Sequence, residues 1–187
     1  MNTFKFRTAT GGDAEAIAAL HTTSWRDAYR GILPDSYLDG PIGDDRAALW
    51  KSRFSTLDSD RLFVVLAETP EKPVGFACVL LDGDLQWGAC LDNLHVLPPW
   101  RNRGVGRLLF GRAAQWIMAT VPGWPIHLWV FEGNAGARRL YDALGGEVVE
   151  HHKKEVLKGI EIPSLLYVWR DIEELVNKID LSIAAAG

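Results

Sequence analysis

The sequence predicts a single α/β domain with a mixed sheet of about seven strands, in the element order β-αα-βββ-α-β-α-ββ. Two observations predict it. Short apolar runs of strand length alternate with segments whose apolar residues recur every three or four positions, the period of a helix. The chain has 187 residues, enough for one well-buried core and short for two. Without repeats or linkers, we expect one domain over 1–187, with a core at about 4–170 and a helical tail at 171–187.

The composition excludes several classes of protein. It is 48% hydrophobic and 24% charged, which is typical of a soluble globular protein. A net charge of −4 argues against nucleic acid as a partner. No apolar run approaches the roughly 18–20 residues of a membrane span, and the N-terminus lacks the features of a signal peptide. Two cysteines make neither a disulfide framework nor a metal site. We therefore expect a cytoplasmic protein without a metal, acting neither on nucleic acid nor on membranes.

The first third of the chain reads as one strand and two helices. Residues 4–7 alternate as a strand, and Thr10 to Asp13 resembles a capping box with Asp at its third position. A helix follows over about 14–25, ending before Gly31, and a second helix over about 44–54. The inward positions of the first helix are Ile17, Leu20, His21 and Ser24.

Three strands are predicted next, over 61–68, 73–81 and about 86–97. The last two are joined by an Asp-Gly-Asp hairpin signal at 82–84, which would bring Cys78 and Cys90 onto neighbouring strands as small apolar fillers.

The remaining elements alternate again. Apolar residues recur at helical spacing over 104–120, and PIHLWVF at 125–131 is typical of a strand covered on both faces. A helix over 134–144 closes at Gly145-Gly146. Two further strands, 147–156 and 162–170, precede the tail. These late strands and the tail offer surfaces through which a homodimer could form.

The stretch between the third strand and the next helix predicts an anion site. The strand stops at Pro98-Pro99 and enters the helix through RNRGVG. Glycines let backbone N–H groups turn inward, and a helix N-terminus adds partial positive charge. The dinucleotide pattern fails because Leu109 stands where its third glycine belongs, and no Gly-Lys-Ser/Thr of a Walker loop is present. We therefore expect the pyrophosphate of a coenzyme other than ATP or NAD.

Two motifs carry a family resemblance. Arg-x-x-Gly-x-Gly at Arg101, Gly104 and Gly106 resembles the coenzyme-A-binding motif of the GNAT superfamily of acyl-CoA N-acyltransferases. Asn-x-x-Ala-x-x-x-Tyr from Asn134 to Tyr141, followed by Leu-Gly-Gly, resembles the second signature of that family. The element order also matches, to about residue 170. The resemblance implies a GNAT-type, mostly antiparallel sheet, acetyl-CoA as co-substrate, and an acetyl group passed to a primary amine.

The coenzyme contacts follow from the loop and from the resemblance. Backbone N–H groups would surround the pyrophosphate, and the loop arginines would add charge, with at least one of them a solvated surface cation. The resemblance further implies a strand that splays from its neighbour, so that its main chain pairs with the pantetheine arm. Asn134 would hold that arm, cap its helix, or do both. The predicted set is Val96, Leu97, Arg101, Asn102, Arg103, Gly104, Val105, Gly106, Arg107, Asn134 and Arg138.

Tyr141 is the candidate general acid. An amine that attacks a thioester must lose a proton, and the thiolate that leaves benefits from gaining one. A tyrosine at this place is the usual proton donor in the family that the sequence resembles. The alternative is that Tyr141 only packs with Leu140 and Leu144.

The general base has two candidates. Many members of the family carry a glutamate where this chain has Asp92-Asn93, and others use a water chain. His95 has the more suitable unperturbed pKa, near 6.5, although it could equally be a partly buried polar residue. Strand alternation puts Asp92 and His95 on opposite faces, so only one should face the cleft unless a bulge intervenes. Asn93 could orient a water or the acceptor.

The acceptor is expected near residues 21–34. Trp25 and Tyr29 are four apart and share a helix face, and with Asp27 they suit a cationic amine; ordinary core aromatics are the alternative. No nucleophile motif is present, so the amine would attack directly in a ternary complex, with the Val96 N–H polarising the thioester carbonyl. The acceptor would be a small molecule, or alternatively a protein N-terminus or lysine. A non-catalytic acyl-CoA-binding module is the other reading.

Overall fold

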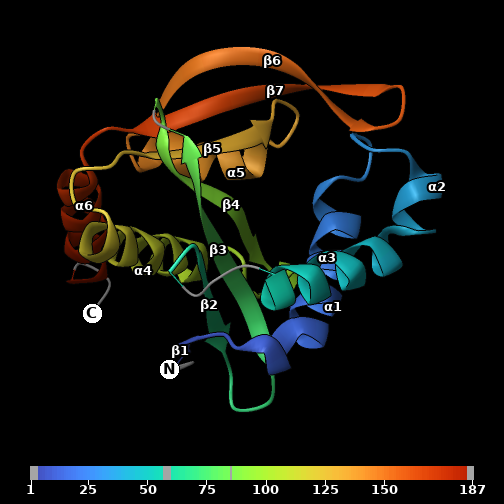
Figure 1. The fold of residues 1–187 in the computed structure, drawn as a ribbon, viewed down its shortest axis with the longest axis horizontal. Coiled ribbons are helices and arrows are strands. Elements are labelled where there is room, and N and C mark those ends of the chain that lie inside the picture. Colours follow the sequence, from blue (N-terminus) through green and yellow to red (C-terminus); the bar gives the residue numbers. More distant parts are fainter. Residues whose placement is uncertain (1–3, 57–59, 85, 185–187) are drawn as a thin grey trace.

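The fold is given by a computed structural model that describes residues 4–56, 60–84 and 86–184. Within these ranges, seven strands form one sheet in the order β1-β2-β3-β4-β5-β7-β6 (Figure 1). Neighbouring strands are antiparallel except β4 and β5, which are parallel. The mixed, mostly antiparallel sheet is therefore confirmed. The strands are β1 (Lys5–Thr8), β2 (Leu62–Glu68), β3 (Pro73–Asp84), β4 (Gly88–Val96), β5 (Ile126–Phe131), β6 (Glu147–Leu157) and β7 (Ile160–Trp169).

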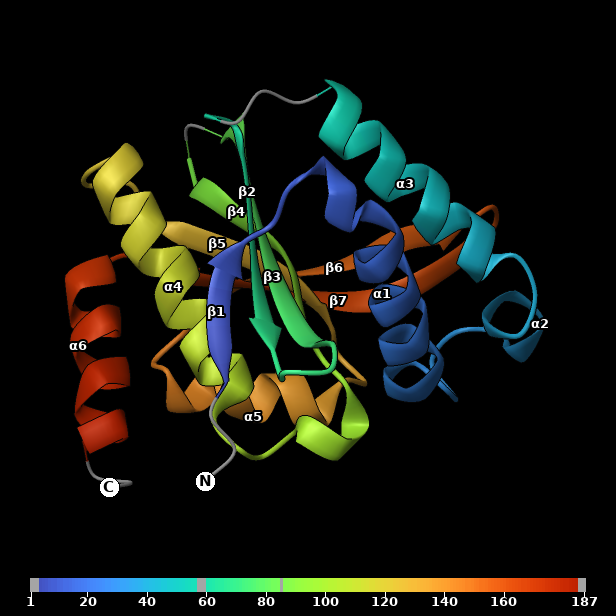
Figure 2. The ribbon, with the colours of Figure 1, turned by 90° about the horizontal axis from the view of Figure 1, so that it is seen from below.

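Helices cover both faces of the sheet. Helices α1 and α3 lie on one face and α4 and α6 on the other (Figure 2). Alternation along β2 serves both layers, because Val64 and Leu66 pack with α1 and α3 whereas Val65 and Ala67 join the cluster around α4. The helices are α1 (Ala14–Ala28), α2 (Asp35–Leu38), α3 (Ile42–Thr56), α4 (Val105–Thr120), α5 (Ala135–Ala143) and α6 (Ile172–Ala184), with 3-10 turns at Gly11–Asp13 and Pro98–Trp100.

The predicted tail packs on the rest of the chain. It forms α6, whose Ile172, Leu175 and Ile179 are buried in the same core as α4. Gly111 of α4 makes this approach possible, because a Cβ there would lie 2.9 Å from Cγ2 of Ile179. Figure 2 shows the two helices side by side on one face of the sheet.

Two details of the sequence prediction were wrong. The short helix α2 was not foreseen, since four residues are too few to show a helical period. The expected hairpin turn at 82–84 instead continues β3, and Asp84 lies opposite Gly88. The first residue of β4, Gly88, must be a glycine, because its φ is 71° and a side chain there would collide with the carbonyl oxygen of Pro125.

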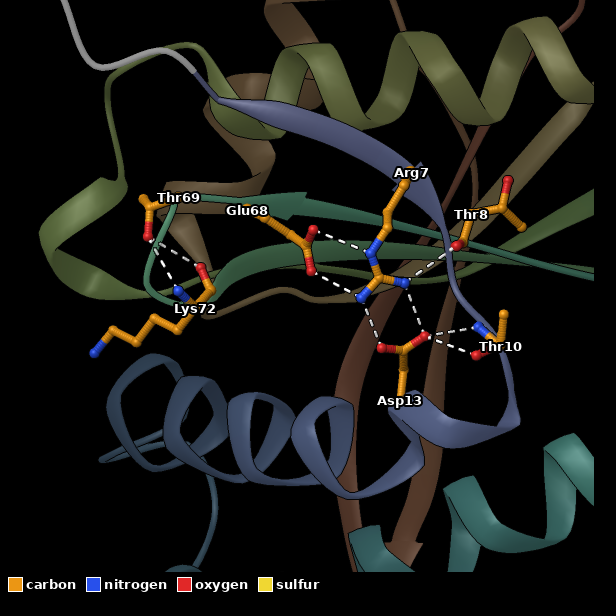
Figure 3. Close-up of polar contacts among 7 residues, drawn as sticks. All are labelled: Arg7, Thr8, Thr10, Asp13, Glu68, Thr69 and Lys72. Atoms are coloured by element: carbon orange, nitrogen blue, oxygen red, sulfur yellow. Dashed lines mark hydrogen bonds and ion pairs between the residues drawn. The ribbon is translucent and has the colours of Figure 1, made fainter.

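A polar cluster anchors the start of α1 (Figure 3). Arg7 of β1 forms ion pairs with Asp13 at 2.7 Å and with Glu68 of β2 at 2.8 Å. The Asp13 carboxylate also accepts from the backbone N–H of Thr10 at 2.8 Å, as predicted from the capping-box pattern. The guanidinium of Arg7 holds the pKa of Asp13 well below its usual range. The contacts join the edge strand to the helix whose C-terminal half borders the site.

No helix in the described part of the chain is both long and apolar enough to cross a bilayer.

Candidate active site

The central feature of the site is a split in the sheet. Strands β4 and β5 pair only at Ala89 with Ile126 and at Cys90 with His127, and they diverge beyond these pairs. The β5-facing backbone of residues 91–96 therefore has no strand beside it, as the family resemblance implied. A cleft of about 910 Å³ opens there, lined by β4, β5, the end of α1, the start of α4 and α5. We call it the coenzyme cleft.

A β-bulge in β4 changes which side chains reach the cleft. Cys78 lies opposite Asn93 and Val79 opposite Leu91, so Asp92 is the additional residue. Simple alternation would leave only one of Asp92 and His95 at the cleft; with the bulge, both line it. Arg53 of α3 holds the bulge, donating to Asp92 Oδ2 at 2.5 Å and to Asn93 Oδ1 at 2.8 Å.

His95 is buried, and its Nδ1 lies 3.1 Å from the Ser24 hydroxyl oxygen. Burial, together with the positive charges of Arg101 and Arg46, lowers the pKa of His95 to about 3. The imidazole is therefore neutral at physiological pH and binds a proton weakly. This disfavours His95 as a general base, but leaves its ring able to hold a water or an amine by hydrogen bonding.

The entry to α4 is shaped for an anion. Asn102 and Gly104 both have positive φ, 59° and 81°. The first intrahelical bond runs from Leu108 N–H to Gly104, so the N–H groups of the preceding residues have no helical partner. Five of the predicted loop residues line the cleft: Arg101, Asn102, Gly104, Gly106 and Arg107.

Other predicted coenzyme residues have different surroundings. Val105 is buried in the core, and the guanidinium of Arg103 lies over the Trp100 ring at 5.2 Å. The N–H of Leu97 donates to Val74 at 2.9 Å, and its carbonyl accepts from Trp100 at 2.9 Å. Because both backbone groups of Leu97 are used within the chain, only Val96 of this pair remains at the cleft.

Arg101 links the loop to α1. Its guanidinium forms an ion pair with Asp27, and its Nε donates to the Val96 carbonyl at 2.9 Å. Asp27, expected to bind the amine, thus pairs with a residue of the coenzyme loop and borders the coenzyme cleft.

Helix α5 supplies the opposite wall. Asn134 caps it by accepting from Ala137 N–H at 3.2 Å, and the same residue lines the cleft. Arg138 turns away, donating to the Glu132 carbonyl at 3.0 Å, whereas Arg139 reaches the cleft. Helical spacing could have predicted that Arg139 lines the cleft, because it lies three residues after Gly136, which lines the cleft too, and therefore on the same helix face.

Tyr141 lies in the wall of the cleft with its ring against Phe110, Tyr167 and Trp169. Its hydroxyl has no hydrogen-bond partner among the described residues, which leaves it available to a ligand. Burial raises the pKa of Tyr141 well above its usual range, so the phenol keeps its proton at neutral pH.

A second cavity of about 270 Å³, the acceptor pocket, adjoins the cleft. The two share Tyr29, Asp92, His95 and Trp129 in their walls. Trp25 and Tyr29 contact each other edge to face at 4.9 Å, as their spacing predicted. Arg46 and Arg53 were not predicted, because no local pattern connects them to the motifs. Ser24 lies within the segment expected near the acceptor, but no role was predicted for it. Among the described residues, no three His, Cys, Asp or Glu side chains are arranged to hold a metal ion.

Comparison with known proteins decides the family. Residues 18–145 match the acetyltransferase (GNAT) family model. The chain belongs to this family. The matched segment contains both motifs and reaches from α1 to the end of α5. It confirms the expected GNAT superfamily and an N-acetyltransferase as the class of enzyme.

Individual GNAT relatives are distant. The chain is 28% identical to a probable N-acetyltransferase of Mycobacterium tuberculosis, over 74% of this chain and 76% of that protein. It is 33% identical to a mycothiol acetyltransferase of Clavibacter michiganensis, over 71% of this chain but only 40% of that longer protein. A solved PaiA N-acetyltransferase from Thermoplasma acidophilum, in complex with coenzyme A, has the same fold, with a TM-score of 0.67 and 17% identity over 89% of this chain and 99% of that one.

Proposed function

We propose that this GNAT protein transfers an acetyl group from acetyl-CoA to the primary amine of a small molecule, by direct attack in a ternary complex. The observation that carries the proposal is the split between β4 and β5 above the N-terminus of α4, with the free hydroxyl of Tyr141 in its wall. The coenzyme A complex of the Thermoplasma acidophilum enzyme, which has the same fold, supports the choice of co-substrate.

Two parts of the cleft would hold the coenzyme. The pyrophosphate would accept from the unpaired N–H groups at the start of α4, with Arg107 and Arg139 supplying charge. The pantetheine amides would pair with the unpaired edge of β4 as an added strand. Asn134, on the opposite side of the cleft, would contact the same arm.

In the chemical step, the amine nitrogen forms a bond to the thioester carbon and the C–S bond breaks. The Val96 N–H would polarise the carbonyl oxygen. Tyr141 would donate to the leaving sulfur as its charge develops. Because burial raises the pKa of Tyr141, the phenol is a weaker acid than a thiol, and its contribution is strongest as a hydrogen bond to the developing thiolate.

The proton lost by the amine needs a base. Asp92 is the better candidate, since its carboxylate lies where the two cavities meet and the lowered pKa of His95 makes the imidazole a poor proton acceptor. His95 and Ser24 would hold the amine or a bridging water.

The test is turnover. Purified protein is mixed with acetyl-CoA and a panel of primary amines, peptides with free N-termini and lysine peptides, while free thiol and acetylated product are measured. Thiol release that requires a small amine supports the proposal. Release that requires a peptide would assign the acetyl group to a protein instead, which the small acceptor pocket disfavours. Tight acetyl-CoA binding without transfer to any acceptor would favour a non-catalytic acyl-CoA-binding module.

A further inference from the structure

One arginine in the acceptor pocket has no neutralising partner. Arg46 of α3 lines the pocket, and its guanidinium lies 4.6 Å from the centre of the Trp25 ring. The carboxylate of the preceding residue, Asp45, accepts from the Tyr37 hydroxyl at 2.8 Å. Within the described residues, no carboxylate lies within ion-pairing distance of Arg46.

The other charges of the pocket are balanced or face outward. Arg53 is neutralised by Asp92. Lys154 is exposed and lies over Trp129 at 5.4 Å. Glu155 is exposed too, and its carboxylate accepts from the N–H of Gly159. The guanidinium of Arg46 is therefore the unbalanced charge inside the pocket.

The same corner is rich in donors. Nε1 of Trp25 and Nε of Arg46 are buried N–H groups without an acceptor in the described structure. Unpaired buried donors are costly, so this corner is suited to a ligand with strong acceptor atoms.

We propose that the acetyl acceptor is an amine that also carries a carboxylate, as an amino acid does. Arg46, beside Trp25, binds the carboxylate, and the amine lies at Asp92 and His95, where the pocket meets the coenzyme cleft. This inference rests on the proposed function and names its substrate class. The amine is placed at Asp92 and not at Asp27, because Asp27 pairs with Arg101 at the coenzyme loop, whereas Asp92 borders both cavities and uses only its Oδ2 in the contact with Arg53. A volume of about 270 Å³ suits a small acceptor.

The experiment compares each standard amino acid with the amine that its decarboxylation would give, wherever that amine is commercially available. Both are assayed as acetyl acceptors at saturating acetyl-CoA. We expect the preferred amino acid to exceed its amine in kcat/KM by roughly tenfold or more. In Arg46→Gln, KM for the amino acid should rise roughly 10- to 100-fold with kcat little changed, and KM for the amine should stay constant. Arg46→Lys should recover part of the loss.

Lys51→Gln is the matched control, since it removes an exposed cation from the same helix and should leave both constants unchanged. Thermal melting and acetyl-CoA affinity verify that each variant is folded. A wild-type preference for the decarboxylated amines, or an equal loss on both members of a pair in a folded Arg46→Gln, would overturn the proposal.

Binding keeps the proposal testable if no acceptor in the panel reacts. Calorimetry with the CoA-saturated protein should detect amino acids in the wild type and weaker binding in Arg46→Gln. If CoA binds and no amino acid does, the carboxylate proposal is wrong while the coenzyme site stands. If acetyl-CoA does not bind to the wild-type protein, the proposed function itself fails.

Discussion

The coenzyme cleft and the acceptor pocket adjoin, yet they are built in different ways. The cleft presents two sets of backbone groups without a strand or helix partner: the edge of β4 beyond Cys90 and the first turn of α4. The pocket presents side chains from α1, α3 and four strands. Backbone recognition requires a particular local conformation, which glycines and caps record in a short motif. Side-chain recognition requires only that segments far apart in the sequence come together in the fold, and it produces no short sequence motif.

Tyr141→Phe should produce the largest effect on the cleft side of this comparison. Loss of the hydroxyl should lower kcat about 100-fold, because the leaving sulfur loses its donor, with acetyl-CoA affinity little changed. Rapid-mixing measurement of thiol release checks this. Tyr167→Phe is the control: its hydroxyl donates to Asp142 at 2.7 Å, so removing it should affect stability and not kcat. Unchanged turnover in Tyr141→Phe would leave Tyr141 a packing residue.

The pH dependence of stability should report on His95, which lines both cavities. The pKa of His95 is about 3 in the folded protein and near 6.5 when unfolded, so the unfolded chain binds more protons between these values. Stability should therefore fall as the pH drops from 6.5 towards 3, and His21, also lowered, adds to this. Urea unfolding at pH 7.5 and 4.5 should give a difference of about 2.7 kcal/mol from His95 alone.

His95→Gln should make the pH dependence of stability shallower. The pH profile of kcat/KM should have the same shape near pH 6.5 in the wild type and in the variant. If such a limb does disappear, His95 titrates in the catalytic cycle and is the base after all.

Gly104→Ala tests whether the loop conformation binds the coenzyme. At a φ of 81°, a Cβ costs about 1–2 kcal/mol, and relaxation of the loop would turn its N–H groups from the cleft. We expect the acetyl-CoA dissociation constant to rise roughly tenfold by calorimetry. Gly123→Ala is the matched control, with a φ of 82°, equally open space and a position outside both cavities. A similar affinity loss in both variants would point to general destabilisation.

Asp27→Asn should have the smallest effect. The ion pair with Arg101 is partly exposed, so its loss should cost at most about 1 kcal/mol of stability. KM for the amine should stay constant, and KM for acetyl-CoA should change slightly as Arg101 becomes free. Steady-state kinetics distinguish the two. A rise in KM for the amine alone would return Asp27 to the acceptor site, where the sequence analysis had it.

Residues whose position depends on local conformation were predicted better than residues whose position depends on how the elements pack. Gly104, Gly106 and Asn134 reach the cleft because the loop and cap conformations are local. Arg138 was chosen from the same helix and turns away, because the helix orientation decides between it and Arg139. The relation of Asp92 to His95 depended on a bulge opposite Cys78 and Val79, which strand periodicity does not encode.

The sequence by itself determined the element order, the family and the glycine-containing entry to α4, since hydrophobic periodicity and glycine conformation act over a few residues. Only the tertiary structure decided the acceptor side. In the folded chain, Asp27 forms an ion pair with Arg101 and Asp92 forms one with Arg53, whereas Arg46 lines the pocket without an ion pair. The charge of a site is the sum over side chains from distant segments, and that sum exists only once the chain has folded.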